Sequence, residues 1–345
     1  VAGSLPKYFD KRYFDIRVIL PKYACMKQEW KDKMNYITHF YMDLGYKNCY
    51  VGIMHMEYEG IQFYFIDNEY YFNRDGLYGY YDDGERFAFF NRAVLEFIKE
   101  IDWKPDIINC NDWQTGMVPV LLNLEYKNNE FYSNMKTVFS IHNLLFKGSF
   151  VPNVLPELFG YDYMPLTNGS VELNGSVSFL KGGINYSDQI TTVSNTYAEE
   201  IKTQQYGEGL DGLLRCKSDF LKGIVNGIDY EEFDPEKDNL IFKNFTWDSI
   251  SDKVENKLSL QKELGLPQRA ETPMIGLISR LTHQKGCDLI VSIIDRLLQK
   301  DIQFIVLGTG DYWYEETFKN LQYRYPDKVS ANIKFDNSLA HKIYA

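Results

Sequence analysis

Short β-branched runs alternate with helical stretches along most of this 345-residue chain, and no other feature constrains its fold as strongly. A strand, a helix and a second strand in succession form a right-handed crossover, which places the two strands parallel in one sheet. The predicted strands cover residues 15–20, 106–110, 136–141, 189–193, 274–279 and 304–307, with a hairpin over residues 50–66 around Glu59-Gly60. The predicted helices cover residues 85–101, 116–124, 288–300 and 313–324, with one more that opens near Ser194.

A polar stretch rich in Asp and Lys, residues 234–252, interrupts this alternation and predicts the passage between two domains. The chain length agrees, because domains average roughly 150 residues. We therefore expect two doubly wound α/β domains, the first over residues 1–240 and the second over residues 250–345.

The charge balance excludes one class of partner. The chain has 37 Lys and Arg against 48 Asp and Glu, a net charge of −11 at pH 7. Binding to a nucleic acid needs clustered cations, and no such cluster is present, so we expect no nucleic acid partner.

No apolar run approaches the roughly 18 residues of a membrane-spanning helix, so we expect no membrane association. Five scattered cysteines suit neither a zinc site nor a disulfide framework, which favours a reducing cytoplasm.

In open α/β sheets, ligands bind at the carboxyl ends of the strands. The loop from Ser279 to Gly286 follows a predicted strand and contains two cations, Arg280 and Lys285. Arginine offers a planar fork matched to phosphate oxygens, lysine a compact charge, and the following helix its backbone N–H groups. The loop thus predicts a diphosphate site, although the same residues also suit an ordinary solvated basic loop.

Two polar pairs follow strands in the first half of the chain, Asp112-Trp113 and His142-Asn143. Taken singly, His142 fits a structural histidine and Asp112 fits a helix cap. At matching ends of strands in one sheet, they become candidates for recognising sugar hydroxyls. The many aromatic rings, 27 Tyr, 23 Phe and 5 Trp, could stack on sugars, but a biased composition explains much of this excess.

Other chemistries find little support. Gly308-Thr309-Gly310 follows a strand, but Trp313 occupies the third glycine position of a dinucleotide fingerprint. A tight turn near a ligand remains an option, because glycine permits close approach. The sequence has no GxSxG elbow, P-loop or HExxH helix, and its five histidines lack metal-ligand spacing. We expect no metal and no cofactor.

Read in order, the motifs of the chain resemble those of the bacterial glycogen synthase and plant starch synthase family. The matching segments are residues 1–6, 85–90, 105–113, 140–143, 179–184, 191–194, 206–215, 223–229 and 279–286. The resemblance implies a GT-B fold, in which two Rossmann-like domains face a cleft, with the acceptor on the first and the nucleotide sugar on the second. It also implies transfer of glucose from ADP-glucose to the non-reducing end of an α-1,4-glucan, with retention and without a metal.

Carried over motif by motif, the resemblance gives roles to eight residues. Arg280 and Lys285 would bind the donor diphosphate, His142 the glucose, and Asp112 the neighbourhood of the glucose or the acceptor. The second-tier contacts near the cleft would be Asn226, Gly308, Thr309 and Gly310. Elementary chemistry agrees, because fixed cations stabilise a departing diphosphate. Such a leaving group does not need the paired carboxylates of retaining glycosidases.

Two family features would lie outside the chain. A Lys-x-Gly-Gly loop should precede Val1, and a Glu-Pro-x-Gly-Leu segment should follow Ala345. We therefore expect a first domain without its first strand and glycine-rich loop, an incomplete second domain, and little or no synthase activity in the fragment alone.

Three other functions remain open. One is a GT-B transferase that uses UDP-glucose, such as a relative of sucrose or trehalose synthase. Another is a non-catalytic glucan-binding protein that kept the fold. The last is an NAD oxidoreductase, which the broken glycine fingerprint disfavours.

Overall fold

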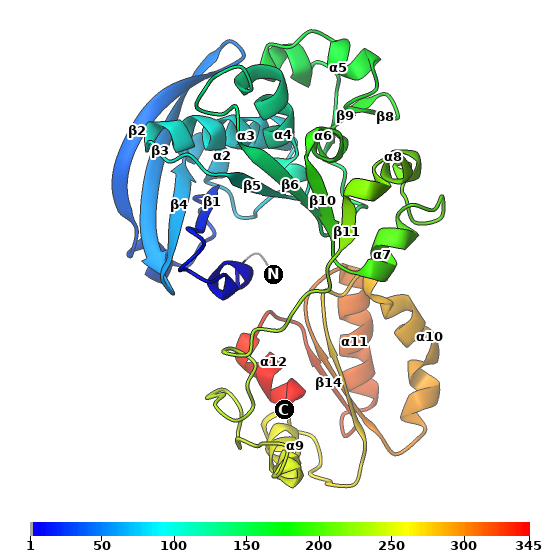
Figure 1. The fold of residues 1–345 in the computed structure, drawn as a ribbon. Coiled ribbons are helices and arrows are strands. Elements are labelled where there is room, and N and C mark those ends of the chain that lie inside the picture. Colours follow the sequence, from blue (N-terminus) through cyan, green and yellow to red (C-terminus); the bar gives the residue numbers. More distant parts are fainter. Residues whose placement is uncertain (1–2) are drawn as a thin grey trace. The chain divides into compact units, whose positions relative to one another are not determined.

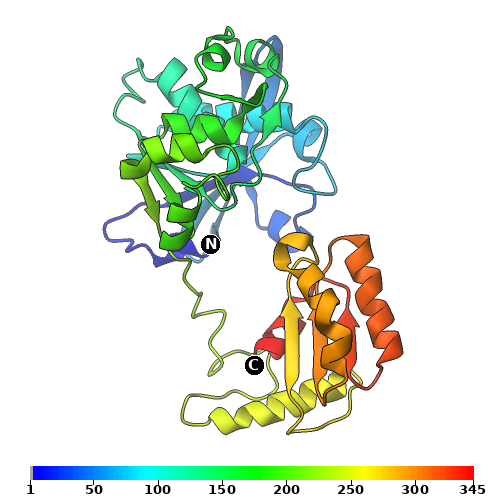
Figure 2. The same ribbon diagram turned by 90° about the vertical axis from the view of Figure 1, so that its right-hand side faces the viewer.

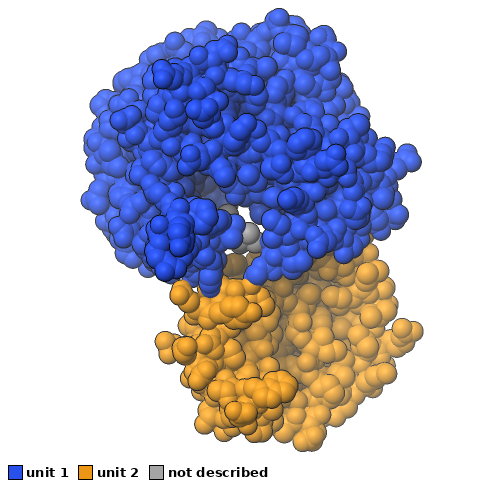
Figure 3. Space-filling view, viewed as in Figure 1, with its two compact units in different colours: residues 1–227 blue, residues 228–345 orange. Residues whose placement is uncertain are grey.

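The computed structural model describes residues 3–345 and divides the chain into two compact units, which meet in the sequence at Gly227 and Ile228 (Figure 3). Each unit contains a parallel sheet whose strands are connected through helices, as the alternation in the sequence predicts (Figures 1 and 2). Within residues 3–345, no helix is long and apolar enough to cross a membrane.

The parallel sheet of the first unit has the order β11-β10-β6-β5. Its strands are β5 (Ile107–Asn111), β6 (Lys136–Ile141), β10 (Gln189–Thr192) and β11 (Leu221–Gly223). Every neighbouring pair is parallel, so all four carboxyl ends lie at one edge. Three of these strands confirm the sequence prediction. Ser194 also opens the helix after β10 as predicted, because its hydroxyl accepts a hydrogen bond from the Tyr197 N–H at 2.9 Å.

A second sheet in the first unit is mixed and has the order β1-β4-β3-β2. Its strands are β1 (Arg17–Pro21), β2 (Asn35–Leu44), β3 (Lys47–Tyr58) and β4 (Ile61–Asp67). The β3–β4 hairpin is confirmed, and its turn residues Glu59 and Gly60 both have positive φ, as a tight two-residue turn requires. β2 was not predicted. It pairs antiparallel with β3 and forms the edge of the sheet.

One long helix organises the core of the first unit. α3 (Asp83–Glu100) packs against β2 and β4 and also against α4 (Met117–Leu121), which continues as a wider turn to Tyr126. The buried rings of Phe87, Phe90 and Phe97 on α3 join the main apolar cluster. The remaining short elements are α1 (Gln28–Lys31), α2 (Glu69–Phe72), β7 (Ser149–Phe150), α5 (Met164–Thr167), β8 (Glu172–Leu173), β9 (Ser176–Ser178), α6 (Phe179–Tyr186), α7 (Asn195–Glu200) and α8 (Asp211–Cys216).

The second unit is a three-layer α/β structure around β13. Its strands are β12 (Met274–Ile278), β13 (Gln303–Leu307) and β14 (Val329–Asn332), and its helices are α9 (Lys253–Glu263), α10 (Cys287–Leu298), α11 (Tyr312–Arg324) and α12 (Asn337–Tyr344). Phe304 and Val306 of β13 pack with α10 and α11. Ile305 and Leu307 point to the opposite face and pack with α9 and α12. This division of one buried strand between two helical layers makes the unit doubly wound.

The segment predicted as the passage between domains is irregular, but it packs on the second unit. Asp238 binds the buried His341 of α12, with 2.6 Å between Oδ2 and Nδ1. The amide oxygen of Asn256 on α9 accepts hydrogen bonds from the backbone N–H groups of Phe242 and Lys243, both at 3.0 Å. The boundary between the two units therefore precedes residues 234–252 in the sequence instead of falling within them.

Candidate functional site

The carboxyl ends of β5 and β6 bring the polar pairs of the first unit together. The two strands are parallel neighbours, with Asn111 opposite Ser140, so the residues that follow them meet at one edge. The Nε2 atom of His142 lies 2.9 Å from the amide oxygen of Asn111. A proton on Nε2 satisfies this contact and leaves Nδ1 as a hydrogen-bond acceptor. Asn111 was part of the motif in the sequence, but its contact with His142 was not foreseen.

Asp112 fixes the turn that follows β6. One of its carboxylate oxygens, Oδ1, accepts hydrogen bonds from the backbone N–H groups of His142 at 2.8 Å and Asn143 at 3.4 Å. The backbone of Asp112 has a φ of +55°, which is unfavourable for a residue with a side chain. The bonds from its carboxylate to the neighbouring loop offset this strain. Asp112 therefore orients the His142 backbone, and this role does not depend on which substrate group Asp112 contacts.

Buried aromatic side chains support the carboxyl ends of β5 and β6 from the core side. Trp113 is buried and its ring contacts those of Phe87 and Phe150, with centroids 4.9 Å and 5.8 Å away. Gly148 has a φ of +54°, and a Cβ at this position would lie 2.5 Å from the Trp113 ring. The tryptophan of the Asn-Asp-Trp motif is therefore part of the core, and it supports Asp112 from the buried side.

Burial raises the pKa of Asp112, and the N–H groups of His142 and Asn143 together with the nearby imidazole lower it in part. A carboxyl whose pKa is higher in the folded state binds more protons there than in the unfolded chain. Its ionisation thus costs stability, and this cost appears as the pH rises above about 3.9, the ordinary pKa of an aspartate.

We therefore expect Asp112→Asn to fold as stably as the parent at pH 7, or slightly more so. The amide keeps the Oδ1 acceptor and removes the buried charge. Asp112→Ala should be clearly less stable, because two N–H groups lose their acceptor while the positive φ remains. Thermal unfolding at pH 4 and pH 7 checks both variants. A large loss of stability in Asp112→Asn at pH 7 would contradict this explanation.

Asn226 follows β11 at the same edge of the sheet. β10 and β6 lie between β11 and β5 in the strand order. Asn226, which follows β11, is therefore two strands away from β6, which precedes His142, and three strands away from β5, which contains Asn111. Its side chain is exposed. The edge that the sequence predicts thus brings Asp112 and His142 into direct contact, whereas Asn226 joins them only by lying at the same end of the sheet.

In the second unit, the predicted cation pair lies in the loop between β12 and α10. Arg280 and Lys285 are both exposed, and within residues 3–345 neither side chain forms an ion pair or a hydrogen bond. Gly286 has a φ of +71° and turns the chain into the first residue of α10. The loop therefore presents two uncompensated positive charges next to the amino end of a twelve-residue helix, which favours an anion there.

The glycines after β13 hold this loop by direct backbone contact. A Cβ on Gly308 would lie 1.8 Å from the Ser279 carbonyl oxygen, and one on Gly310 would lie 2.2 Å from that of Leu281. The Leu281 N–H also donates to the Thr309 carbonyl oxygen at 2.9 Å. The sequence predicts that these glycines permit a close approach to a ligand. In the structure, the two glycines approach the backbone of the loop that contains Arg280. Thr309 itself is exposed.

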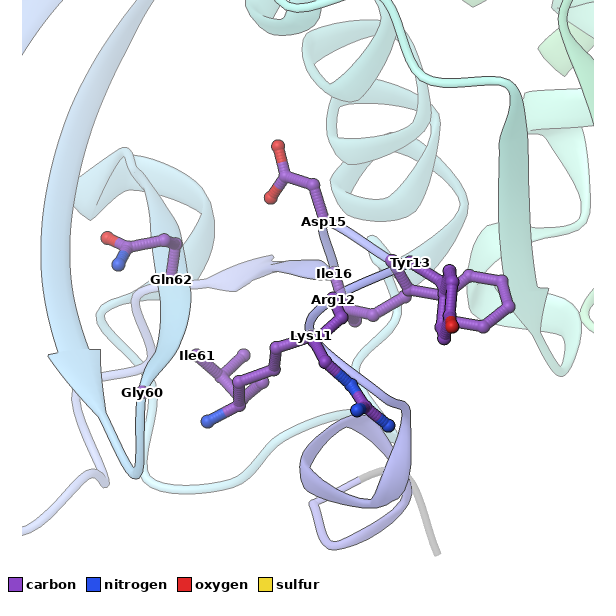
Figure 4. Close-up of a pocket in the computed structure, with 9 residues that line it drawn as sticks. Lys11, Arg12, Tyr13, Asp15, Ile16, Gly60, Ile61 and Gln62 are labelled. Carbon is purple, nitrogen blue, oxygen red and sulfur yellow. The ribbon is translucent and has the colours of Figure 1, made fainter.

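In the mixed sheet of the first unit, a hollow of about 440 Å³ lies at the amino end of β1, beside the β3–β4 turn (Figure 4). It is lined by residues 11–16 and 60–62, and Lys11 closes one side by donating to the Glu59 carbonyl oxygen at 2.9 Å. None of the predicted site residues lines it. A smaller hollow of about 220 Å³ lies at the carboxyl ends of β1 and β4, beside the Lys22–Asp67 ion pair.

Two α/β units with parallel sheets, together with the match to a solved starch synthase catalytic domain at 32% identity, make this chain a glycosyltransferase of the GT-B class. A family model for the starch synthase catalytic domain matches residues 1–216. The chain belongs to the glycogen and starch synthase family of hexosyltransferases, which use a sugar nucleotide as donor and a glucan as acceptor. The predicted family, fold class and type of enzyme are thereby confirmed.

The relatives match the chain along its whole length. A glycogen synthase from Clostridium perfringens is 63% identical over 345 residues, which are all of this chain and 72% of that protein. A glycogen synthase from Clostridium botulinum is 58% identical over 346 residues, with the same coverage. Among solved structures, the catalytic domain of starch synthase IV from Arabidopsis thaliana, bound to ADP and acarbose, superposes with a TM-score of 0.92 at 32% identity. This match covers the whole of this chain and 72% of the chain in that structure.

Proposed function

We propose that this enzyme transfers glucose from ADP-glucose to the non-reducing end of an α-1,4-glucan, with retention at the anomeric carbon. The observation that carries this proposal is the pair of exposed cations, Arg280 and Lys285, in the loop before α10. The names of the relatives support the glucan product, and the plant neighbour was solved with ADP and acarbose.

In this reaction, the two cations would stabilise the diphosphate leaving group. When the bond between C1 of glucose and the diphosphate oxygen breaks, its electrons remain on the diphosphate and positive charge develops on the sugar. We assign Arg280 and Lys285 to the diphosphate, where the guanidinium can bind two oxygens at once and the ammonium supplies a second charge. Their attraction to the leaving group grows as the bond breaks, so they lower the barrier instead of only tightening donor binding.

The first unit supplies the residues for the sugar. We assign His142 to the glucose, with its ring held by Asn111 and its backbone held by Asp112. Asp112 stands next to the glucose or the acceptor in this assignment. Asn226 is proposed as a second-tier contact, as is the exposed turn Gly308-Thr309-Gly310. The glycines of that turn act mainly by supporting the Arg280 loop.

Labelled donors test this proposal. Incorporation of glucose into glycogen should be much faster from ADP-glucose than from UDP-glucose, and enzymes specific for α-1,4 bonds should release the new residues. Faster incorporation from UDP-glucose would favour the alternative donor. New linkages that resist α-specific digestion would contradict retention. Calorimetric titration with ADP and UDP provides a readout of donor binding that does not depend on turnover.

We also propose that the enzyme acts in the cytoplasm. Cys25 and Cys216 are exposed free thiols, and Cys49, Cys110 and Cys287 are buried free thiols. Exposed unpaired thiols are typical of a reducing compartment. Fractionation of cells that express the tagged protein would test this location.

A further inference from the structure

Glu208 places a long side chain at a backbone position that suits glycine better. Within residues 3–345, five residues other than glycine have a positive φ. Glu59 and Asn174 each precede a glycine in a two-residue hairpin turn, which needs this conformation. Asp102 follows the end of α3, and Asp112 belongs to the candidate site. Glu208 has a φ of +53° in the irregular segment between α7 and α8, which is unfavourable for a residue with a side chain.

The turn around Glu208 does not need a glutamate side chain. Glu208 lies between Gly207 and Gly209, in a turn held by hydrogen bonds of the main chain. The Gly207 N–H donates to the Thr203 carbonyl oxygen at 2.8 Å, and the Leu210 N–H donates to the Gly207 carbonyl oxygen at 2.7 Å. Leu210 also anchors the turn in the core. A third glycine would keep these contacts without the strain, so formation of the turn does not explain the glutamate.

The carboxylate of Glu208 binds Lys147, in the loop that follows His142. Oε2 of Glu208 lies 3.0 Å from Nζ of Lys147, which also donates to the Leu145 carbonyl oxygen at 3.4 Å. The two residues are 61 positions apart, so their ion pair connects the loop after β6 to the segment before α8. The Glu208 side chain is 40% exposed, and exposed pairs contribute little to stability. A gain in stability therefore does not explain the strain at Glu208.

The ion pair restrains one side of a loop whose other side is anchored in the core. The Lys147 carbonyl oxygen accepts a hydrogen bond at 2.9 Å from the hydroxyl of the buried Ser178, which caps α6. Leu145 and Phe146, by contrast, expose apolar side chains. The Lys147 side chain leads from the anchored backbone to the Leu145 carbonyl group and to Glu208. It thus limits the movement of the exposed residues that follow the candidate sugar site.

Tyr197 of α7 links this ion pair to Asp112. Its hydroxyl accepts a hydrogen bond from the Leu144 N–H at 3.3 Å. Burial raises the pKa of Tyr197, the Leu144 N–H lowers it in part, and the carboxylates of Glu208 and Asp112 raise it further. Both carboxylates therefore act on the hydroxyl that holds the loop, which places Glu208 close to the residues that orient His142.

We propose that Glu208 and Lys147 are positioning residues for glucose transfer, whose ion pair fixes residues 143–147 so that His142 keeps its working geometry. This inference rests on the proposed function, because it takes His142 as the residue that binds glucose. The two residues act through the loop and need no contact with the substrate. The strained backbone of Glu208 then serves activity at the expense of stability.

The main test is Glu208→Gly, which removes the carboxylate and the unfavourable φ together. Its unfolding temperature should equal that of the parent or exceed it slightly, because the relief of strain offsets the loss of an exposed ion pair. Its kcat for glucose transfer should nevertheless fall about tenfold, since a small displacement near the reacting groups slows a reaction strongly. Binding of ADP, measured by calorimetry, should not change, because Arg280 and Lys285 belong to the other unit.

Charge exchange provides the second test. Lys147→Glu alone places two carboxylates together and should be at least as slow as Glu208→Gly. Combined with Glu208→Lys, it restores a pair of opposite charges, so kcat should recover most of the loss. Glu199→Gln is the matched control, since Glu199 pairs with Lys202 at 2.8 Å and the lysine in both ion pairs is 19% exposed. This control should transfer glucose at the parent rate.

Hydrogen exchange shows directly whether the ion pair holds the loop. Amide exchange in residues 143–147 should be faster in Glu208→Gly than in the parent, and it should return to the parent rate when the charges are exchanged. Unchanged exchange, unchanged kcat, or a fall in kcat that follows a fall in the unfolding temperature would each overturn the proposal. Absence of transfer by the parent would count against the proposed function, whereas the exchange rates would still decide whether Glu208 and Lys147 hold the loop.

Discussion

Arg280→Ala is expected to lower kcat/KM for glucose transfer by about a hundredfold to a thousandfold, the usual effect of removing one preorganised donor from a developing negative charge. The loss should lie mainly in kcat, because the leaving group gains charge as the bond to glucose breaks. The fold should be unaffected, since the exposed guanidinium has no ion-pair partner within residues 3–345. Initial rates with labelled donor, together with thermal unfolding, measure both effects.

Two variants sharpen this test. Arg280→Lys keeps the charge but loses the planar fork, so its rate should fall between those of the parent and Arg280→Ala. Arg296→Ala is the matched control, because Arg296 is an exposed arginine on α10 of the same unit. Near-normal glucan synthesis by Arg280→Ala would remove Arg280 from the proposed chemistry, and an equal loss in Arg296→Ala would point to a general effect of charge.

The largest effect on stability is expected for Arg86→Ala. The Arg86 side chain is fully buried in α3, pairs with the buried Asp83 and donates to the Tyr71 carbonyl oxygen at 2.7 Å. Its guanidinium also lies 4.9 Å from the centre of the Tyr80 ring. Removing it leaves a buried carboxylate without its partner, at a cost of about 3–5 kcal/mol. For a unit of this size, the unfolding temperature should fall by roughly 10 °C or more.

Scanning calorimetry measures this loss, and the ion pair between Arg12 and Asp10 provides the control. That pair has the same chemistry but is exposed, so Arg12→Ala should change the unfolding temperature very little. Replacing both members of the buried pair, as in Arg86→Met/Asp83→Leu, should recover part of the loss, because no unpaired charge remains. If Arg86→Ala unfolds at the parent temperature, the buried pair does not hold the start of α3 in place.

The parts of the fold that follow a strong periodic pattern could be predicted from the sequence. α3 has regularly spaced apolar residues, and β6 and β13 are short runs bounded by polar loops, so their patterns predict them closely. β2 was missed because aromatic and polar residues share its exposed positions and hide the alternation. α9 was missed because its sequence is polar and directly follows the Asp- and Lys-rich stretch.

Long-range contacts explain what the sequence could not show about the units and the candidate site. The hydrogen bond between Asp238 and His341 spans 103 residues and attaches the irregular segment to the second unit. The positive φ of Asp112 depends on N–H groups that lie 30 and 31 residues further along the chain. The sequence did place Asp112 and His142 at neighbouring strand ends, because parallel strands share one edge.

The backbone contact between residues 308–310 and the Arg280 loop has a consequence for protein engineering. Gly308 and Gly310 touch the carbonyl groups of Ser279 and Leu281, so the two loops fit each other as a matched pair. A chimera that exchanges only one of them with a distant relative would bring two unmatched backbones together. The two segments should therefore be exchanged together, even though more than twenty residues of chain separate them.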